Sequence, residues 1–216
     1  MKLVFASNNA HKLEEVRAIM PAGIDVLSLH EVGFEQEIEE TGTTLEENSR
    51  IKAETVSQWL TANSQQSVDG VFADDTGLEI DALDGKPGVY TARWYLDGGE
   101  RLKVKGEREI FAANRAKALR ELKGQTDRGA QFKTVVTLIM KPTPTLPKGK
   151  ELEQVSGIVR GRIDTEERGE GGFGYDPIFV PEGYDKTFAE LSAEVKNSIS
   201  HRARAMEKLV EILSKI

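Results

Sequence analysis

Two adjacent carboxylates, Asp74 and Asp75, follow the apolar residues 71–73 and precede Thr76 and Gly77. Because neighbouring residues of a strand face opposite sides, one carboxylate can face a ligand while the other braces the adjoining loop. Strand ends are also where open α/β sheets bind ligands. An Asp-rich turn without any function is the alternative interpretation, since Asp and Gly favour turns for local reasons.

A second carboxylate pair, Glu39 and Glu40, precedes a helical pattern that carries Asn48 and Lys52 one turn apart. Mg²⁺ prefers oxygen ligands and keeps several waters, so two carboxylates from different segments and substrate phosphates would suffice to hold it. A negatively charged helix entrance, stabilised by the helix dipole, is the alternative.

Residues 7–12 connect an apolar strand pattern to a helical pattern, which is a favourable place to bind phosphate. Backbone N–H groups and the positive end of the helix would face the ligand. Ser7 and Asn9 add hydrogen-bond donors, and Lys12 adds a positive charge. An ordinary helix N-cap followed by a solvated lysine explains the same residues.

The glycines at 169, 171 and 174 have the spacing of a dinucleotide-binding fingerprint, but their context does not fit one. Charged residues precede them instead of an apolar strand, and Pro177 follows instead of a helix. We therefore reject a Rossmann site. A loop that approaches a ligand closely, with Phe173 or Tyr175 stacked on a base, remains possible on these residues.

Near the end of the chain Lys196, His201 and Arg202 flank the start of the last helical pattern. Donors near a helix N-terminus reverse the usual preference for acids there, although simple surface charge is an alternative explanation. His11, His30 and His201 lack the spacing of a zinc site.

These candidates must be positioned by alternating strands and helices, which favours an α/β chain. Apolar patterns predict strands at residues 2–6, 70–74, 132–140, 155–163 and 177–180. Helical spacing predicts a helix from Leu13 that stops at Pro21, and Thr43 with Glu46 has the signature of a capping box. Two further helices are expected, in residues 111–122 and 199–216. Surface loops are expected at residues 61–69 and 142–150, and the second loop would connect the strands of a β-hairpin.

The composition of the 216 residues, with 29 basic and 36 acidic side chains and no cysteine, restricts the possible functions. A net charge of −7 argues against a nucleic-acid partner, because non-specific affinity depends on Lys and Arg neutralising phosphates. The absence of cysteine excludes disulfides, thiolate metal sites and a cysteine nucleophile. No apolar run suggests a signal peptide or membrane partner, so we expect a cytoplasmic location.

An ordered series of motifs along nearly the whole chain resembles the inosine triphosphate pyrophosphatase family, the XTP/dITP diphosphatases. The matching positions are Ser7, Asn9 and Lys12; residues 39–42; Glu47, Asn48 and Lys52; residues 73–78, 87–93 and 171–177; and Lys196, Ile199, Ser200, His201 and Arg202.

The resemblance implies a single domain over residues 1–216, with a mixed sheet flanked by helices and a nucleotide cleft between two lobes. It also implies a homodimer and a magnesium-dependent hydrolase that converts non-standard purine nucleoside triphosphates (XTP, ITP, dITP) to monophosphate and pyrophosphate. Asp75 would be the catalytic carboxylate and would bind magnesium with Glu39, with Glu40 as the alternative ligand. The substrate-binding residues that it implies are Ser7, Asn8, Asn9, Ala10, His11, Lys12, Lys52, Thr76, Phe173, Gly174, Tyr175, Asp176, Lys196, His201 and Arg202.

Within that set, residues 7–12 and Lys52 would hold the triphosphate, and residues 173–176 would enclose the base and sugar. Lys196, His201 and Arg202 would read the purine. Thr76 and Thr91 stand where serine is commoner in the family. Residues 94–108 and 142–150 match no motif, and the first stretch would alter a lid or a dimer contact. A catalytically silent nucleotide-binding protein and a hydrolase of pyrimidine nucleotides are the rival interpretations.

Overall fold

The computed structural model describes residues 1–63, 67–96, 106–141 and 151–215. Contacts divide the chain into two compact units, and strands β3, β5 and β6 contribute residues to both. Unit 1 consists of Met1–Asp75, Thr134–Gly157 and His201–Ile216, and unit 2 consists of Thr76–Lys133 and Ile158–Ser200. The expectation of a single domain stays a prediction.

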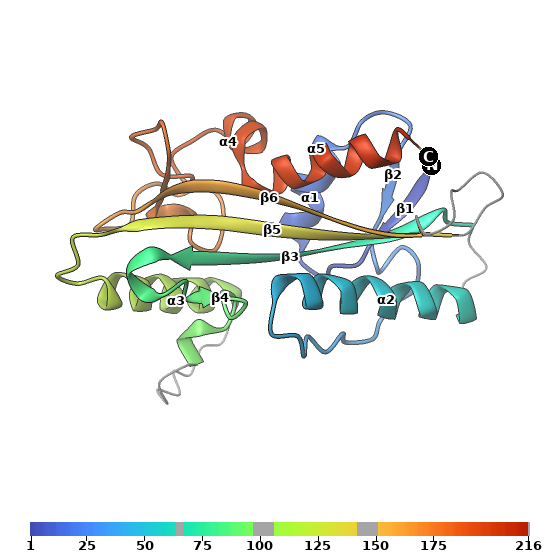
Figure 1. Ribbon diagram of the computed structural model, residues 1–216, viewed down its shortest axis with the longest axis horizontal. Helices are drawn as coiled ribbons and strands as arrows, with labels where there is room; N and C mark the ends of the chain where they lie inside the picture. Colours follow the sequence, from blue (N-terminus) through green and yellow to red (C-terminus); the bar gives the residue numbers. More distant parts are fainter. Residues whose placement is uncertain (64–66, 97–105, 142–150, 216) are drawn as a thin grey trace. The chain divides into compact units, whose positions relative to one another are not determined.

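Helices and strands alternate along the chain, as the sequence predicted (Figure 1). The strands are β1 Lys2–Phe5, β2 Asp25–Leu27, β3 Gly70–Ile80, β4 Pro87–Gly88, β5 Gly129–Met140, β6 Leu152–Ile163 and β7 Phe179–Pro181. The α-helices are α1 Ala10–Ile19, α2 Leu45–Asn63, α3 Glu107–Glu121, α4 Ala193–Ile199 and α5 His201–Leu213. Short 3-10 helices span Asp81–Leu83, Trp94–Leu96 and Asp176–Ile178.

In the described part of the chain the strands form one mixed sheet in the order β2-β1-β3-β5-β6-β7, with β4 paired to β3. β1 runs parallel to β2 and β3, whereas the β3–β4 and β6–β7 pairs are antiparallel. The predicted α/β class, a mixed sheet flanked by helices, is therefore confirmed. β5 and β6 are neighbours, as the expected hairpin requires, but its connecting residues 142–150 lie outside the described residues.

Side-chain alternation along β1 and β3 gives unit 1 two apolar cores. Phe5 and Phe72 face one side, where they pack with side chains of α1 and α5. Val4, Val71 and Ala73 face the other side, where α2 covers them. Figure 1 shows α1 and α5 on one side of these strands and α2 on the other. The side to which each β3 residue points is thus fixed by its place in the alternation.

Gly157 of β6 allows α5 to pack directly against this strand within unit 1. A Cβ atom at this position would collide with the backbone of His201 and Ala205. Any larger residue would have to push the helix away from the strand, because backbone cannot move aside as a flexible side chain can. Glycine therefore sets the distance of the helix that carries Arg202.

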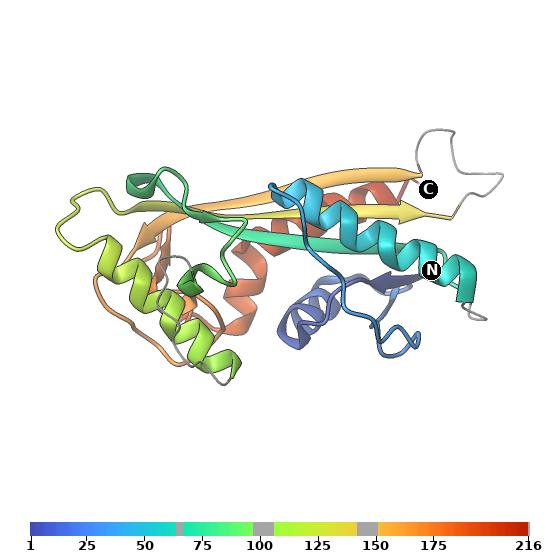
Figure 2. The same cartoon turned by 90° about the horizontal axis from the view of Figure 1, so that it is seen from below.

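Unit 2 has its own core, to which Ala118 of α3 and Leu122, the C-cap residue of that helix, contribute together with Leu78 and Phe132 of the strands. Phe132, Phe179 and Phe188 form a cluster in that core, with ring centroids 4.7 to 6.4 Å apart. Seen from below, α3 lies beside the segment that leads from β6 towards β7 (Figure 2). Helix α3 is therefore placed to hold that segment, which contains the glycine cluster.

Some element boundaries differ from the predictions. β3 does not end at Asp74 but continues to Ile80, so Asp74 and Asp75 lie within a strand and not at its end. Helix α2 extends to Asn63, into the predicted loop. Its capping box is one residue later than predicted, because Glu47 N–H donates to Thr44 Oγ1 at 3.1 Å and the Glu47 carboxylate accepts from the amides of Thr43 and Thr44.

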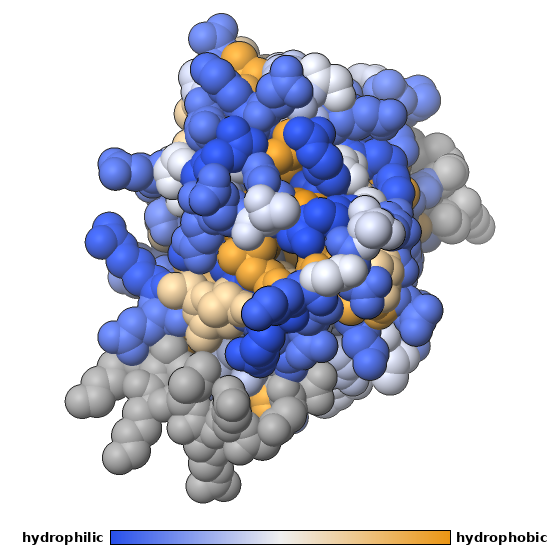
Figure 3. Space-filling model, turned by 90° about the vertical axis from the view of Figure 1, so that its left-hand side faces the viewer, coloured by the Kyte–Doolittle hydropathy of each residue, from blue (hydrophilic) through white to orange (hydrophobic). Residues whose placement is uncertain are grey.

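The face of unit 2 in Figure 3 is mostly hydrophilic, with apolar residues gathered in small groups. None of the helices in the described ranges has the length and apolarity that a membrane span requires. Residues 97–105, the greater part of the stretch for which a lid or dimer contact was expected, lie outside the described residues.

Candidate active site

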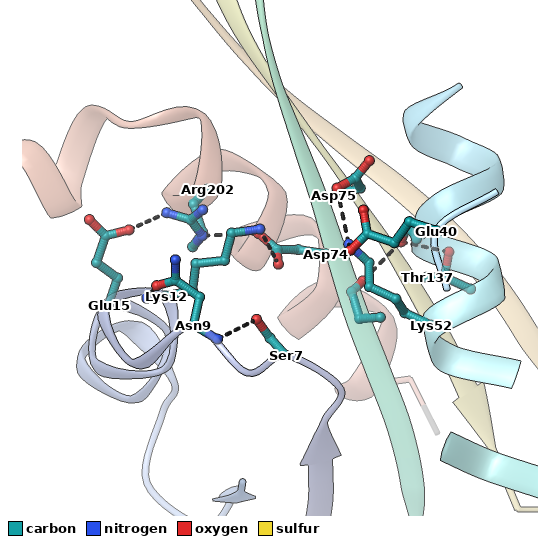
Figure 4. A network of polar contacts seen from close by, with 12 residues as sticks. Ser7, Asn9, Lys12, Glu15, Glu40, Lys52, Asp74, Asp75, Thr137 and Arg202 are labelled. Atoms are coloured by element: carbon teal, nitrogen blue, oxygen red, sulfur yellow. Dashed lines mark hydrogen bonds and ion pairs between the residues drawn. The ribbon is translucent and has the colours of Figure 1, made fainter. Parts of the chain in front are cut away.

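The two carboxylates of β3 point to opposite sides of the strand and meet different partners. Asp74 is fully buried and Asp75 is 7% exposed. Asp74 continues the side of Phe72, where α1 and α5 lie, and Asp75 continues the side of Ala73, where α2 lies. Figure 4 shows both carboxylates on the same strand with separate sets of charged neighbours.

Asp74 is held between two cations from different helices. Lys12 Nζ of α1 lies 2.9 Å from Asp74 Oδ1, and Arg202 Nε of α5 lies 3.2 Å from Asp74 Oδ2. The guanidinium of Arg202, itself 1% exposed, also pairs with Glu15 of α1. Asp74 and Glu15 thus join α1, β3 and α5 through buried ion pairs, as Figure 4 shows.

Burial and charge act against each other in this cluster. Burial alone would raise the pKa of Asp74, but Lys12 and Arg202 outweigh it and hold the pKa well below its usual range. Burial lowers the pKa of Lys12 more than the charge of Asp74 raises it, and the nearby charges of Lys52 and Arg202 lower it further. A polyanion that approached Lys12 would therefore stabilise its charged form.

The loop before α1 positions Lys12 by capping the helix. Asn9 is the N-cap residue, and its side chain accepts a hydrogen bond from the Lys12 N–H at 3.0 Å. The Ser7 hydroxyl in turn accepts from the Asn9 N–H at 3.3 Å. The capping interpretation is thus correct, and it is compatible with a ligand role because it directs Lys12 to Asp74. The remaining loop residues are exposed: Asn8, Ala10 and His11.

Asp75 has a different environment on the α2 side. Lys52 Nζ lies 3.0 Å from Asp75 Oδ1 and 3.2 Å from Glu40 Oε1. In the part of the chain that the structure describes, Asp75 Oδ2 is buried without a hydrogen-bond partner. Burial raises the pKa of Asp75 against the opposing charges of Lys52 and Lys12. Asp75 is consequently a stronger base than an ordinary aspartate, with one oxygen that no group of the described residues satisfies.

Of the acidic pair before α2, Glu40 joins this network, whereas Glu39 is exposed. The turn that carries both is fixed by Asn48, whose Oδ1 accepts a hydrogen bond from the Gly42 N–H at 2.8 Å. A Cβ at residue 42 would lie 2.6 Å from the same oxygen, so glycine is required there.

A chain of neutral hydrogen bonds fixes α2 to the strands beside Asp75. The Ser49 hydroxyl donates to the carbonyl of Ala73 at 2.9 Å and lies 2.9 Å from Thr137 Oγ1. Gln154 Nε2 donates to the same Thr137 oxygen at 2.8 Å. Ser49 and Lys52 belong to the same helix, so these bonds also set the position from which Lys52 reaches Asp75.

A second cluster lies within unit 2. The Asp176 carboxylate accepts hydrogen bonds from Lys196 Nζ and from the backbone N–H of Phe173, both at 2.7 Å. The Lys196 ammonium lies 4.7 Å from the centroid of the Phe173 ring. A Cβ at Gly172 would collide with the Asp176 carboxylate, and its φ of 68° also favours glycine. An aromatic face, a cation and a carboxylate are thus held together at the glycine cluster.

Tyr175 supports this cluster from within the core. Its hydroxyl donates to the carbonyl of Thr91 at 3.0 Å, and burial raises the pKa of Tyr175, so the hydroxyl stays protonated. The Phe173 ring contacts Phe111 of α3, with centroids 6.2 Å apart.

The structure thus sorts the predicted site residues into two sets. Unit 1 brings together Lys12, Lys52, Asp75 and Arg202, and unit 2 brings together Phe173, Asp176 and Lys196. The other predicted residues are placed as follows: Thr76 half-buried on β3, His201 buried at the first position of α5, and Gly174 and Tyr175 beside Phe173.

The prediction grouped Arg202 with Lys196, but in the structure Arg202 contacts Asp74 and Glu15. Glu15 was not predicted at all, and Asp74 was expected only as a brace. The double Asp was the sequence signal for Asp74. No local signal pairs Glu15 with a residue 187 positions away.

The buried pairs of Asp74 lead to a prediction about stability. Asp74→Asn leaves the buried Arg202 and the partly buried Lys12 without their shared counterion, so we expect a loss of roughly 3–5 kcal/mol in the free energy of unfolding at pH 7. The pKa of Asp74 is lower in the folded protein than in the unfolded chain, where it is about 3.9. Asp74 therefore contributes fully to the free energy of unfolding above the unfolded-state pKa, and this contribution falls as pH drops towards the folded-state pKa. Urea unfolding at pH 7, 5 and 3 measures both effects.

The control is Asp81→Asn, because the Asp81–Arg160 pair is exposed and should contribute about 1 kcal/mol or less. The account is contradicted if Asp74→Asn lowers the free energy of unfolding by as little as the control does. It is also contradicted if the difference in free energy of unfolding between wild type and Asp74→Asn grows as pH falls below 4.

Comparisons with known proteins give the chain its relatives. A Flavobacterium johnsoniae protein named dITP/XTP pyrophosphatase is 43% identical over 214 residues, which cover 99% of this chain and 98% of the relative. A Bacillus subtilis protein with the same name is 45% identical over 213 residues, covering 97% of this chain and 96% of the relative.

Solved structures show the same fold. The Staphylococcus aureus Ham1 protein has a TM-score of 0.78 and 38% identity, over 100% of this chain and 99% of that one. A HAM1 protein from Coxiella burnetii has a TM-score of 0.80 and 32% identity, with full coverage of both chains. Residues 3–212 also match the sequence model of the Ham1 family. The chain belongs to the Ham1 family.

Proposed function

We propose that this protein is a nucleoside triphosphate pyrophosphatase that hydrolyses dITP, XTP and ITP to the monophosphate and pyrophosphate. The observation that carries the proposal is the pair of oppositely directed carboxylates on β3, each held by its own lysine. The names of relatives that match over the whole chain support the choice of substrates. Clearing non-standard purines from the nucleotide pool would follow from this activity.

The lysines of unit 1 suit the triphosphate. Lys12 and Lys52 are each bonded to a carboxylate, so their ammonium groups are held in place before a ligand arrives. Each ammonium group has three N–H donors. Carboxylates accept one hydrogen bond from Lys12 and two from Lys52. The remaining donors can bind phosphate oxygens, and the exposed start of α1 adds backbone N–H groups.

The residues present fit a magnesium ion, the cofactor that the sequence resemblance implies. Asp75 Oδ2 is a buried oxygen without a partner, which is the kind of ligand that Mg²⁺ prefers. In the described ranges no group of three or more His, Cys, Asp or Glu side chains could hold a metal, so water and phosphate would complete the coordination. Asp75 with Glu39, or with Glu40 as the alternative, would hold the ion.

When bound, the ion would supply positive charge that offsets the charge developing on the phosphates. The protein's own groups do the remaining work. Asp75 orients a water and accepts its proton while the water oxygen attacks the α-phosphorus; the bond from that phosphorus to the bridging oxygen breaks, and pyrophosphate leaves. Lys12 and Lys52 stabilise the negative charge on the departing group.

The cluster in unit 2 suits the base. The Phe173 ring offers a face for stacking, and Lys196 and the backbone offer donors for a 6-oxo group. Adenine presents a 6-amino donor instead, and leaving buried donors unpaired costs roughly 1–3 kcal/mol. Guanine shares the 6-oxo group, so its exclusion depends on the 2-position. The role of His201 and Arg202 as purine readers stays a prediction, and so do the substrate contacts expected of the remaining residues.

The cleft between two lobes, the homodimer and the cytoplasmic location also stay predictions.

The experiment that tests the proposal is a substrate panel. We expect pyrophosphate release with Mg²⁺ for XTP, dITP and ITP, with a kcat/KM at least tenfold above that for ATP, because one mismatched donor is worth about that factor. The kcat/KM values for GTP and dUTP should also lie below those for XTP and dITP. Release of pyrophosphate and monophosphate in equal amounts identifies the bond that is cut.

The panel also separates the rival functions. Nucleotide binding without any pyrophosphate release would favour a catalytically silent nucleotide-binding protein. A preference for dUTP would favour a pyrimidine hydrolase. Release of orthophosphate instead of pyrophosphate would contradict attack at the α-phosphorus.

The role of Asp75 leads to a second prediction. Asp75→Asn removes the proton acceptor with little change of shape, so kcat for dITP should fall by about 100-fold or more while nucleotide binding is partly retained. Asp25→Asn, the same change at an exposed position of β2, is the control and should have wild-type kinetics. Turnover by Asp75→Asn at near the wild-type rate would refute the assignment.

A further inference from the structure

Arg115 of α3 contacts both ends of the glycine-rich segment 167–174. Its Nη1 donates to the carbonyl oxygen of Gly174 at 2.9 Å, and its Nη2 lies 3.0 Å from Glu167 Oε2. The Arg115 side chain is 14% exposed and that of Glu167 is 42% exposed. One guanidinium therefore spans the segment. Its contact with the exposed Glu167 is open to solvent, and its contact with the Gly174 carbonyl is better shielded.

This segment needs external support because its backbone is unusually free. Gly169, Gly172 and Gly174 all have positive φ angles, of 84°, 68° and 61°. Glycine loses more conformational entropy on ordering than any other residue, so a segment with several glycines is costly to hold in one conformation. Two other bonds hold the backbone of the segment: the Gly171 N–H donates to the Ala189 carbonyl at 3.1 Å, and the Phe173 N–H donates to the Asp176 carboxylate at 2.7 Å. Arg115 adds a bond to the carbonyl of Gly174 itself.

The end that Arg115 holds carries the aromatic face of the unit 2 cluster. Phe173 directly precedes Gly174, and its ring lies below the Lys196 ammonium and against Phe111. Phe111 and Arg115 are four residues apart on α3 and so lie on one face of the helix. Helix α3 thus holds the ring by an aromatic contact and the adjoining carbonyl by a charged hydrogen bond.

We propose that Arg115 is a positioning residue for base recognition: by fixing the carbonyl of Gly174 it holds the Phe173 ring and the backbone beside it in the conformation that binds the purine. This inference rests on the proposed function. Arg115 makes no direct contact with substrate in this account. Its effect should therefore be confined to ligands that carry a base.

The kinetic test compares a ligand with a base and one without. Arg115→Met keeps the length and apolar stem of the side chain but removes both polar contacts. We expect KM for dITP to rise about tenfold, the effect of one lost charged hydrogen bond. The inhibition constant of inorganic tripolyphosphate, which has no base, should change by less than about twofold, and kcat should fall less than KM rises.

Two further variants serve as controls. Arg120→Met makes the same change at an exposed position of α3 and should leave both constants unchanged. Arg115→Lys can restore one contact but cannot span Glu167 and Gly174 with a planar fork, so its KM should lie between wild type and Arg115→Met.

A measurement on the nucleotide-free protein tests the same inference without activity. Amide hydrogen exchange in residues 167–176 should be about tenfold faster in Arg115→Met than in wild type, while exchange in α2 is unchanged.

The outcomes separate this inference from the proposed function. If wild type does not hydrolyse dITP, the proposed function fails, and base recognition by this segment fails with it. If wild type is active and Arg115→Met has a wild-type KM, or weakens tripolyphosphate as much as dITP, the positioning role is overturned. Unchanged exchange in residues 167–176 also overturns it.

Discussion

The site in unit 1 depends on the alternation of side chains along one strand. Since β3 continues through Asp74 and Asp75, the two carboxylates must point to opposite sides, towards different helices. Asp74 meets Lys12 and Arg202, and Asp75 meets Lys52 and Glu40. If β3 ended at Asp74, as the sequence predicted, this separation would not be imposed, and both carboxylates could compete for the same cations.

This separation gives chemically identical side chains different roles. Asp74 is saturated by cations, which keeps it ionised and makes it a support for α1 and α5. Asp75 keeps one oxygen unpartnered and has a raised pKa, which suits it to bind a cation or accept a proton. The same pairs fix the ammonium groups of Lys12 and Lys52, which are the groups that the proposed function assigns to the triphosphate.

The sequence predicted those parts of the fold and site that depend on local patterns. The succession of elements and the loop at residues 7–12 follow from spacing and motif, whereas the roles of Asp75 and of residues 173–176 were implied by the family resemblance and stay predictions. The sequence could not locate the end of β3, because Asp74 to Gly77 read as a turn, and only pairing with other strands keeps them extended. Nor could it pair Arg202 with Glu15, or Arg115 with Gly174, since such contacts depend on how distant segments pack.

The most direct test of the central claim is an NMR titration of the two carboxyl carbons in the metal-free protein. The account predicts that Asp74 titrates well below the usual aspartate value of about 3.9, and Asp75 above it. Titration of both carboxyls together near the usual value, or in the opposite order, would contradict the claim that one strand separates a supporting carboxylate from a reactive one.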